Sequence, residues 1–441
     1  MAAARRAHYR GRVAGDGTIG EARPREAAGR ARMLAPFGVR SFRFQWPADL
    51  ATSCAFEMET IALGWFILVE TRSVLLLTAF ASLQYIGTLL APLVGLLGDR
   101  VTHRRLLCAM RATYLLLAAL ICALSVAGLL GPVEAFALAA LAGLVRASDA
   151  GLRNVLTGET MPHALLAGAM GLSRITHDSA RALGALAGAG LVAMLGMSGA
   201  YLCIVALYGA ALLLTLGTGA RRADAPPRPA APRAASPWSD IAAAIRIVWS
   251  MPPQLAVMSL AFLINIATYP FILGLLPYVA REVYGTSQAG LGWMVAATAG
   301  GCVAASVLLS VLGNRVLAGR TMIGFAILWQ LLTIVLGQTG GLATGIPVLL
   351  LTGIVQGLCM VPMSVIQLRH APPELRGRIA GLRTLAVYGL PLGLWISGPL
   401  IGWLGFAGTT LLYGAIGLAC TLAMLLRWRA VLWPAGAEAN R

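Results

Sequence analysis

Between two long apolar runs, residues 95–105 read Gly95-Leu96-Leu97-Gly98-Asp99-Arg100-Val101-Thr102-His103-Arg104-Arg105. The connection is too short to form a domain, yet it carries one acidic residue and four basic or titratable residues. If both apolar runs cross a membrane, the connection must emerge on one side of it. Because cytoplasmic loops carry the excess of basic residues, we expect this loop to be cytoplasmic.

The composition indicates an integral membrane protein. Of the 441 residues, 58% are hydrophobic and only 12% are charged, and the mean hydropathy is +0.78. Soluble domains contain roughly 25% charged residues. Apolar runs of about 20 residues recur along the chain, which is the length that a helix needs to span a bilayer. The lipid bilayer is therefore the first expected partner.

The charge pattern excludes several other functions. The net charge is +17, and all 34 basic residues are arginine, so a P-loop, which requires lysine, is excluded. The arginines are spread over the tails and alternate loops, which favours membrane orientation over nucleic-acid binding. Seven cysteines lie in or at the ends of apolar runs without metal-site spacing, and we expect no metal and no cofactor: Cys54, Cys108, Cys122, Cys203, Cys302, Cys359 and Cys420.

The hydrophobic pattern predicts an all-α membrane protein with twelve transmembrane helices in two six-helix bundles. The expected spans are about 46–68, 74–97, 106–130, 133–156, 165–194, 200–216, 255–279, 290–312, 321–336, 346–366, 379–400 and 403–426. We expect a kink at Tyr269-Pro270. The arginines fall in the connections of one side, which places both termini in the cytoplasm. The expected division is 1–43 disordered basic tail, 44–216 N-terminal bundle, 217–250 linker with an interfacial helix, 251–428 C-terminal bundle and 429–441 tail.

The pattern G-x-x-x-D-R-x-x-x-R-R in residues 95–105, followed by Leu-Leu, resembles the signature loop of the major facilitator superfamily of transporters. Its flanks are similar to the drug- and siderophore-exporter branch, the enterobactin-exporter-like or transmembrane-secretion-effector proteins. Residues 372–378, Pro-Pro-Glu-Leu-Arg-Gly-Arg, resemble the same branch. Residues 182–190 resemble the G-P-x-x-G-G stretch of antiporter members, with Ala185 in place of proline. In the signature loop, most members of the superfamily carry glycine at the position of Thr102.

The resemblance implies a proton-coupled exporter of an amphipathic small molecule, such as a drug-like metabolite or siderophore, that acts by alternating access in the inner membrane. We expect a monomer. The resemblance also implies a gate at the cytoplasmic side, where arginines cap the C-terminal end of a neighbouring helix. Its candidate residues are Gly95, Asp99, Arg100, Arg104, Arg105, Arg376 and Arg378. Alternatively, these arginines only set the topology.

Span 1 contains two acidic residues, Glu57 and Glu59, close to its middle. Two helical positions differ by about 200° of rotation, so the two side chains cannot point the same way. A carboxylate in an apolar environment favours its protonated form, which suits reversible protonation near neutral pH. We expect one of them to couple transport to protons, although a glutamate that only satisfies a neighbouring helix remains open.

Spans 4 and 5 each carry charged residues along one helix face. The sets are Arg146, Asp149 and Arg153 on span 4, and Arg174, His177, Asp178 and Arg181 on span 5. Counted from the loop between them, they reach similar depths, which predicts the pairs Arg146–Asp178 and Asp149–Arg181. Asp149 and Asp178 are further proton-coupling candidates. The network is either a switch between states or a static set of salt bridges.

The second half offers polar and aromatic residues in place of charges, and these suit a large apolar ligand. The candidates are Asn265, Tyr269, Gln356, Met360 and Tyr388, although most such residues serve packing. No G-x-S-x-G or H-E-x-x-H motif is present, so we expect no enzyme. The alternatives are an importer or facilitator of a small metabolite, and a membrane scaffold or sensor that uses its basic tail.

Overall fold

The computed structural model describes residues 35–85, 87, 102–146, 148–219, 246, 249–312, 318–369, 386–429 and 433. The chain is helical throughout these ranges, and eight helices are long and apolar enough to cross a membrane. Most of the linker at 217–250, where the interfacial helix was expected, and nearly all of the C-terminal tail lie outside the described residues.

The first span is longer than the apolar run predicted. A short 3-10 helix, Ala35–Gly38, leads into α2, Arg40–Thr71, which begins inside the range expected to be a disordered tail. The extension is ordered because Phe42 packs, fully buried, against Met161 and Ala169. Residues 1–34 lie outside the described part of the chain.

The remaining helices of the first half follow the predicted order. They are α3 Val74–Leu83, α5 His103–Val126, α6 Pro132–Arg146, α7 Asp149–Thr160 and α8 His163–Leu216. The predicted span 4 corresponds to α6 and α7 together, and the stretch Pro132–Thr160 is long and apolar enough to cross a membrane as one span. Asp149, in the first turn of α7, is buried.

Helix α8 contains two spans. Its first part runs beside α2, with Gly184 against Cys54 and Gly188 against Met58, so the helices approach at glycines as small-residue packing requires. Its second part runs against α5, where Ser198 and Ser125 share a hydrogen bond of 2.9 Å near one end. The reversal occurs at Gly196, whose φ of 70° suits only glycine.

The seventh span is broken into short pieces. They are α10 Pro252–Ala267, α11 Tyr269–Leu273, α12 Leu276–Tyr278 and a π-type turn, Val279–Val283. The predicted kink at Tyr269-Pro270 is confirmed, and Pro277 begins the next break. Proline removes a backbone donor and clashes with the preceding turn, so each proline starts a new helical piece.

The last spans are α13 Gln288–Leu312, α14 Ala318–Gly337, α15 Leu342–Arg369 and α17 Gly389–Arg427. Helix α17 reverses at Gly405, as α8 does at Gly196. Eight long helices, two of them holding a reversal, together with the shorter apolar helices α3 and α10, are consistent with twelve passages of the described chain.

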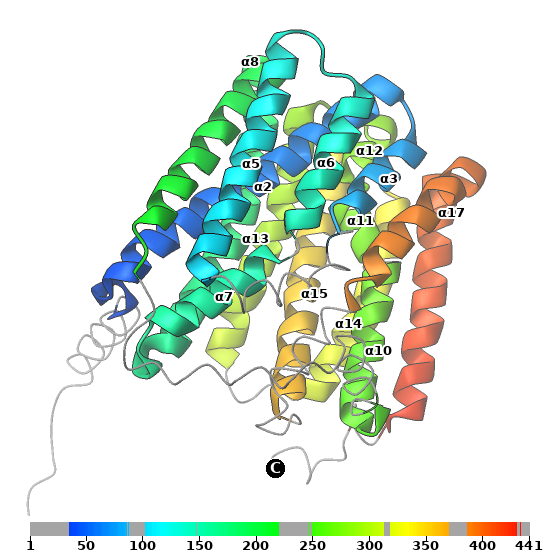
Figure 1. The fold of residues 1–441 in the computed structure, drawn as a ribbon. Helices are drawn as coiled ribbons and strands as arrows, with labels where there is room; N and C mark the ends of the chain where they lie inside the picture. The colour runs from blue at the N-terminus through cyan, green and yellow to red at the C-terminus, as the bar shows by residue number, and fades with distance from the viewer. Residues whose placement is uncertain are drawn as a thin grey trace, which may run out of the picture.

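The long helices run between two ends of the molecule (Figure 1). At the glycine-turn end, four turns use glycine at positive φ: Gly128, Gly196, Gly285 and Gly405. The basic end carries Arg104, Arg105, Arg427 and Arg429. Every described helix that crosses the molecule runs between these two ends, in the order that the alternation of arginines predicted.

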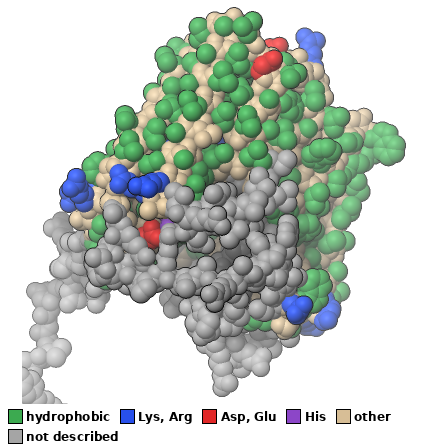
Figure 2. Space-filling view, in the orientation of Figure 1, with side chains coloured by type: hydrophobic (Ala, Val, Ile, Leu, Met, Phe, Trp, Pro, Cys, Tyr) green, Lys and Arg blue, Asp and Glu red, His purple; other side chains and the backbone are tan. Residues whose placement is uncertain are grey.

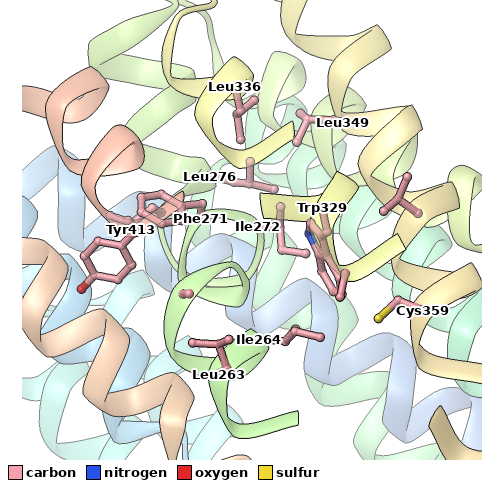
Figure 3. Packing of buried hydrophobic residues seen from close by; sticks show 14 of the residues in the cluster. Leu263, Ile264, Phe271, Ile272, Leu276, Trp329, Leu336, Leu349, Cys359 and Tyr413 are labelled. Carbon is pink, nitrogen blue, oxygen red and sulfur yellow. The ribbon is translucent and has the colours of Figure 1, made fainter. Parts of the chain in front are cut away.

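Each half has its own apolar core. One core is built mainly by residues 55–208, and the other mainly by residues 256–413 (Figure 3). In the second core the Phe271 ring meets the Tyr413 ring edge-on at 5.2 Å between centroids. Figure 2 shows a flank that is covered by hydrophobic side chains. Leu116 and Trp403 are among the large apolar residues of the described chain that are exposed. An exposed apolar flank of this extent suits lipid, since soluble monomers rarely expose one.

The two halves meet near the glycine-turn end. There Gly64 of α2 faces Pro277, and Gly398 of α17 faces Thr78 of α3. On the other side of the cavity, Gly292 of α13 faces Ala189 of α8. Small residues at these crossings let helices of different halves approach closely.

Candidate functional site: a central cavity with one charged wall

A cavity of about 320 Å³ lies between the two halves. Such a volume is at the lower end of the range for small-molecule sites. Its walls differ sharply in chemistry. Seven titratable or charged side chains line it from the first half: Glu57, Tyr85, Arg146, Asp149, Arg153, His177 and Arg181. The second half contributes only apolar residues and one glycine: Ile272, Leu273, Gly274, Leu276, Pro277 and Val295.

The breaks in the seventh span shape the apolar wall. Ile272 and Leu276, labelled in Figure 3, lie on α11 and α12, on either side of the break before Pro277. A continuous helix would turn its residues away at fixed steps of about 100°. The interruptions instead let consecutive short pieces line the cavity. Hydrophobicity alone gives no signal of this, because the whole span is apolar.

The two glutamates of α2 lie in different environments. Glu57 lines the cavity. Glu59 points between helices, where its Oε2 accepts a hydrogen bond of 2.8 Å from the Tyr208 hydroxyl and lies 4.0 Å from Arg146. The sequence predicted that the two could not face the same way, and the structure distinguishes Glu57 as the cavity residue.

Arg146, at the end of α6, is held by neutral acceptors. It donates to Gln84 Oε1 at 2.7 Å, to Thr60 Oγ1 at 3.2 Å and to the Phe56 carbonyl oxygen at 2.9 Å. Its guanidinium carbon also lies 4.0 Å from the centre of the Phe56 ring, a cation–π contact. These contacts connect α6 to α2 and to the end of α3.

A second charge cluster lies beside the cavity, toward the basic end. Asp49 forms an ion pair with Arg111, which is completely buried, and lies 3.7 Å from Arg153 Nε. Arg153 also pairs with Asp149 four residues earlier. Arg111 donates in addition to Thr215, so the cluster joins α2, α5, α7 and α8. Two carboxylates and two arginines make it neutral.

Sequence reasoning missed two members of this cluster, Asp49 and Arg111. Both signals were available, since each is an ionisable residue inside a predicted span, and such residues face a partner or a cavity. The ion pair between them shows that they lie within the helix bundle.

The expected cross-pairs between spans 4 and 5 differ from the structure. Asp149 pairs with Arg153 on its own helix, and Asp149–Arg181 is not among the ion pairs within the described residues. Asp149 and Arg153 lie four residues apart on α7, so the two side chains lie on the same helix face and pair locally. The side chains of Asp178 and Arg174 lie outside the description, so Arg146–Asp178 stays a prediction.

Arg181 lies on the same cavity as Glu57, across from α2. No hydrogen bond or ion pair of either side chain occurs within the described residues. Their charges nevertheless act on each other, and Arg181 is the strongest opposite charge at Glu57. The two therefore remain available to a third group.

The second-half candidates lie behind the apolar wall. None of Asn265, Tyr269, Gln356, Met360 and Tyr388 is among the residues that line this cavity. Asn265 donates to a carbonyl of its own helix, and Gln356 donates to the Tyr269 hydroxyl at 3.2 Å. Tyr269 packs edge-on against the buried Trp329. Their role in substrate binding stays a prediction.

Little of the expected gate is visible. Gly95, Asp99, Arg100, Arg376 and Arg378 lie outside the described residues. Arg104 donates to the carbonyl oxygen of Leu216, the last residue of α8, which is the cap geometry expected for such arginines. Arg105 is exposed. His103 precedes these arginines, and its Nδ1 lies 2.9 Å from Oε1 of Glu159 at the end of α7.

A helical membrane protein whose two packed halves enclose a central cavity has the architecture of a secondary transporter. The profile of the Major Facilitator Superfamily matches residues 50–391, so the chain belongs to that superfamily and is a transporter rather than an enzyme. A search of curated proteins found no match. In the described residues, no group of histidine, cysteine and acidic side chains could hold a metal ion.

Solved structures agree with this assignment of the fold. The chain is similar to the POT family transporter PepTSo, with a TM-score of 0.70 and 14% identity over 89% of this chain and 98% of that one. It is also similar to the nucleoside transporter NupG, with a TM-score of 0.67 and 14% identity over 88% of this chain and 99% of that one. A third similar structure is a bacterial homologue of the human lysosomal transporter Spinster in an inward-facing and unoccupied conformation. Its TM-score is 0.66, with 14% identity over 90% of this chain and 99% of that one.

Proposed function

We propose that the protein exports an amphipathic small molecule from the cell in exchange for protons, by alternating access about the central cavity. The observation that carries the proposal is the cavity itself, which combines a charged wall with an apolar wall. An amphipathic molecule matches both walls, because its polar part meets the charges and its body meets the apolar wall.

Glu57 is the proposed proton-coupling residue. It lines the cavity and has no hydrogen bond or ion pair within the described residues, whereas Glu59 is bound by Tyr208. A carboxylate in a partly dry cavity changes its charge when it takes up a proton, and that change can alter both substrate binding and the balance between states. Glu59 serves the packing of α2 instead.

The orientation follows from the arginines. We place the basic end on the cytoplasmic side of the cell membrane and the glycine-turn end on the opposite side, with both termini in the cytoplasm. The contacts between the halves at the glycine-turn end then block access from outside. Export as the direction rests on the likeness of residues 95–105 and 372–378 to the exporter branch.

The proposal is tested by measuring how much substrate accumulates inside energised inverted membrane vesicles, because an exporter pumps its substrate into them. A panel of dyes, antibiotics and siderophores is offered with and without a protonophore. We expect accumulation that collapses with the gradient, and we expect Glu57→Gln to abolish the gradient dependence. The matched control is Glu70→Gln, an exposed residue on the same helix.

The other outcomes are equally informative. Accumulation that ignores the gradient would refute proton coupling and favour a facilitator. Movement of substrate only in the opposite direction would favour an importer. Loss of function on deletion of residues 1–34, with no transport of any compound, would favour a scaffold, because a transporter retains its helices from Arg40 onward.

A further inference from the structure

Two opposite charges on the cavity wall lack a direct partner. Asp149 and Arg153 pair with each other, and Arg146 is held by three acceptors. Glu57 and Arg181 also line the cavity, but no ion pair joins them under a limit of 4.0 Å. Among the described residues, neither side chain has another ion pair or a hydrogen bond.

The helices hold these two charges near each other without letting them meet. Glu57 lies on α2 and Arg181 on the first part of α8, and the two helices are in close contact through Gly184 and Gly188. Gly184, three residues after Arg181 on α8, lies against the Cβ of Glu57. Opposite charges in a poorly solvated cavity attract strongly, so a gap between them suits a molecule that bridges it.

We propose that Glu57 and Arg181 bind the two opposite charges of one zwitterionic substrate. A cationic group of the ammonium type binds Glu57, an anionic group of the carboxylate type binds Arg181, and the apolar body lies against Ile272, Leu276 and Val295. The inference rests on the proposed function, since it assumes that the transported molecule occupies this cavity.

Charge balance favours a zwitterion over a simple ion. A cation at Glu57 would leave Arg181 uncompensated and would face its repulsion. An anion at Arg181 would likewise leave Glu57 uncompensated and would be repelled by it. Among charged molecules, only one that carries both charges leaves each residue compensated and the pair neutral, and an uncompensated charge in a low-dielectric site is costly.

The same arrangement explains the sign of coupling. A proton on Glu57 removes the partner of the cationic group, so proton and substrate compete for one carboxylate. Competition of this kind gives exchange of substrate for protons. A purely anionic substrate would instead bind best when Glu57 is protonated, and proton and substrate would then travel together.

Three indole compounds that share one apolar body test the charge requirement. Tryptophan is the zwitterion, tryptamine the cation and indole-3-propionate the anion. Binding to the purified full-length protein in detergent at neutral pH is measured by titration calorimetry. We expect tryptophan to bind about tenfold or more tightly than either of the others, since one charged contact is lost in each.

Substitutions then assign each charge to its residue. Glu57→Gln should weaken tryptophan and tryptamine about tenfold but leave indole-3-propionate unchanged or tighter. Arg181→Gln should weaken tryptophan and indole-3-propionate but not tryptamine, and Arg181→Lys should retain most tryptophan binding. Glu70→Gln and Arg429→Gln, both at exposed positions, should change nothing. Thermal unfolding of each variant checks that it is folded.

Several results would overturn the inference. They are equal binding of all three compounds, no tryptophan binding at millimolar concentration, or a uniform loss of all three on either substitution. The test uses no gradient, so a protein that binds the zwitterion but ignores protons would disprove the proposed coupling alone. A protein that exports in a gradient-dependent way but prefers the cation or the anion would disprove this inference alone.

Discussion

Asp49→Asn should strongly destabilise the first bundle. The substitution keeps the shape of the side chain but removes its charge. Arg111, which is fully buried, then meets a neutral amide oxygen in place of the carboxylate, beside Thr215 and a backbone carbonyl, and the cluster changes from neutral to a net charge of +1. Removing one partner of a buried ion pair costs about 3–5 kcal/mol, because the remaining charge stays buried without compensation.

The measurement is the free energy of unfolding in mixed micelles titrated with SDS. A double-mutant cycle of Asp49→Asn and Arg111→Gln separates the pair from its surroundings, and the double variant should cost less than the sum of the two single ones by about 1–3 kcal/mol. Glu70→Gln, an exposed glutamate on the same helix, should cost less than about 0.5 kcal/mol. Additive costs, or a loss below about 1 kcal/mol for Asp49→Asn, would refute the assignment of a buried pair.

Three further predictions follow from single contacts. Tyr208→Phe removes the hydroxyl that donates to the buried Glu59 carboxylate on α2. It should lower the free energy of unfolding by about 1–3 kcal/mol in the same SDS titration, and an unchanged value would contradict the hydrogen bond. Gly301→Ala should prevent stable expression, because its methyl group would collide with the backbone of α15, while Gly300→Ala, which meets open space, should express normally. The pair Ala189→Cys and Gly292→Cys should form a disulfide across the halves under oxidation and stop transport until it is reduced; full activity of the crosslinked protein would disprove alternating access at this end.

Hydrophobicity and arginine placement sufficed to predict the order of spans, because both reflect the bilayer directly. A stretch of about 20 apolar residues must be helical in lipid, and arginine excess distinguishes the two sides. The sequence could not locate the break between α6 and α7. Neither proline nor glycine marks this point, and Arg146 and Asp149 read as positions on one continuous helix face.

The site was only partly predictable for the same reason. The helix period correctly separated Glu57 from Glu59, since rotation within one helix is a local property. It could not decide which of them faces the cavity, because that depends on how α2 is rotated against α8 and α6. The pairing of Asp49 on α2 with Arg111 on α5 likewise depends on how these helices are rotated against each other.

The distribution of charge between the two halves has a mechanical consequence for the proposed cycle. In the described part of the cavity wall, every charged side chain belongs to the first half, so rocking of one half against the other separates no ion pair within that wall. Between the described parts of the two halves, the contacts are mainly apolar contacts and close helix crossings, such as Gly292 against Ala189, with a hydrogen bond of 3.3 Å from the Ser82 hydroxyl to the Pro391 carbonyl oxygen. Breaking contacts of that kind costs far less than separating buried charges. The charged wall can therefore bind substrate or proton as a fixed unit while the apolar wall moves past it.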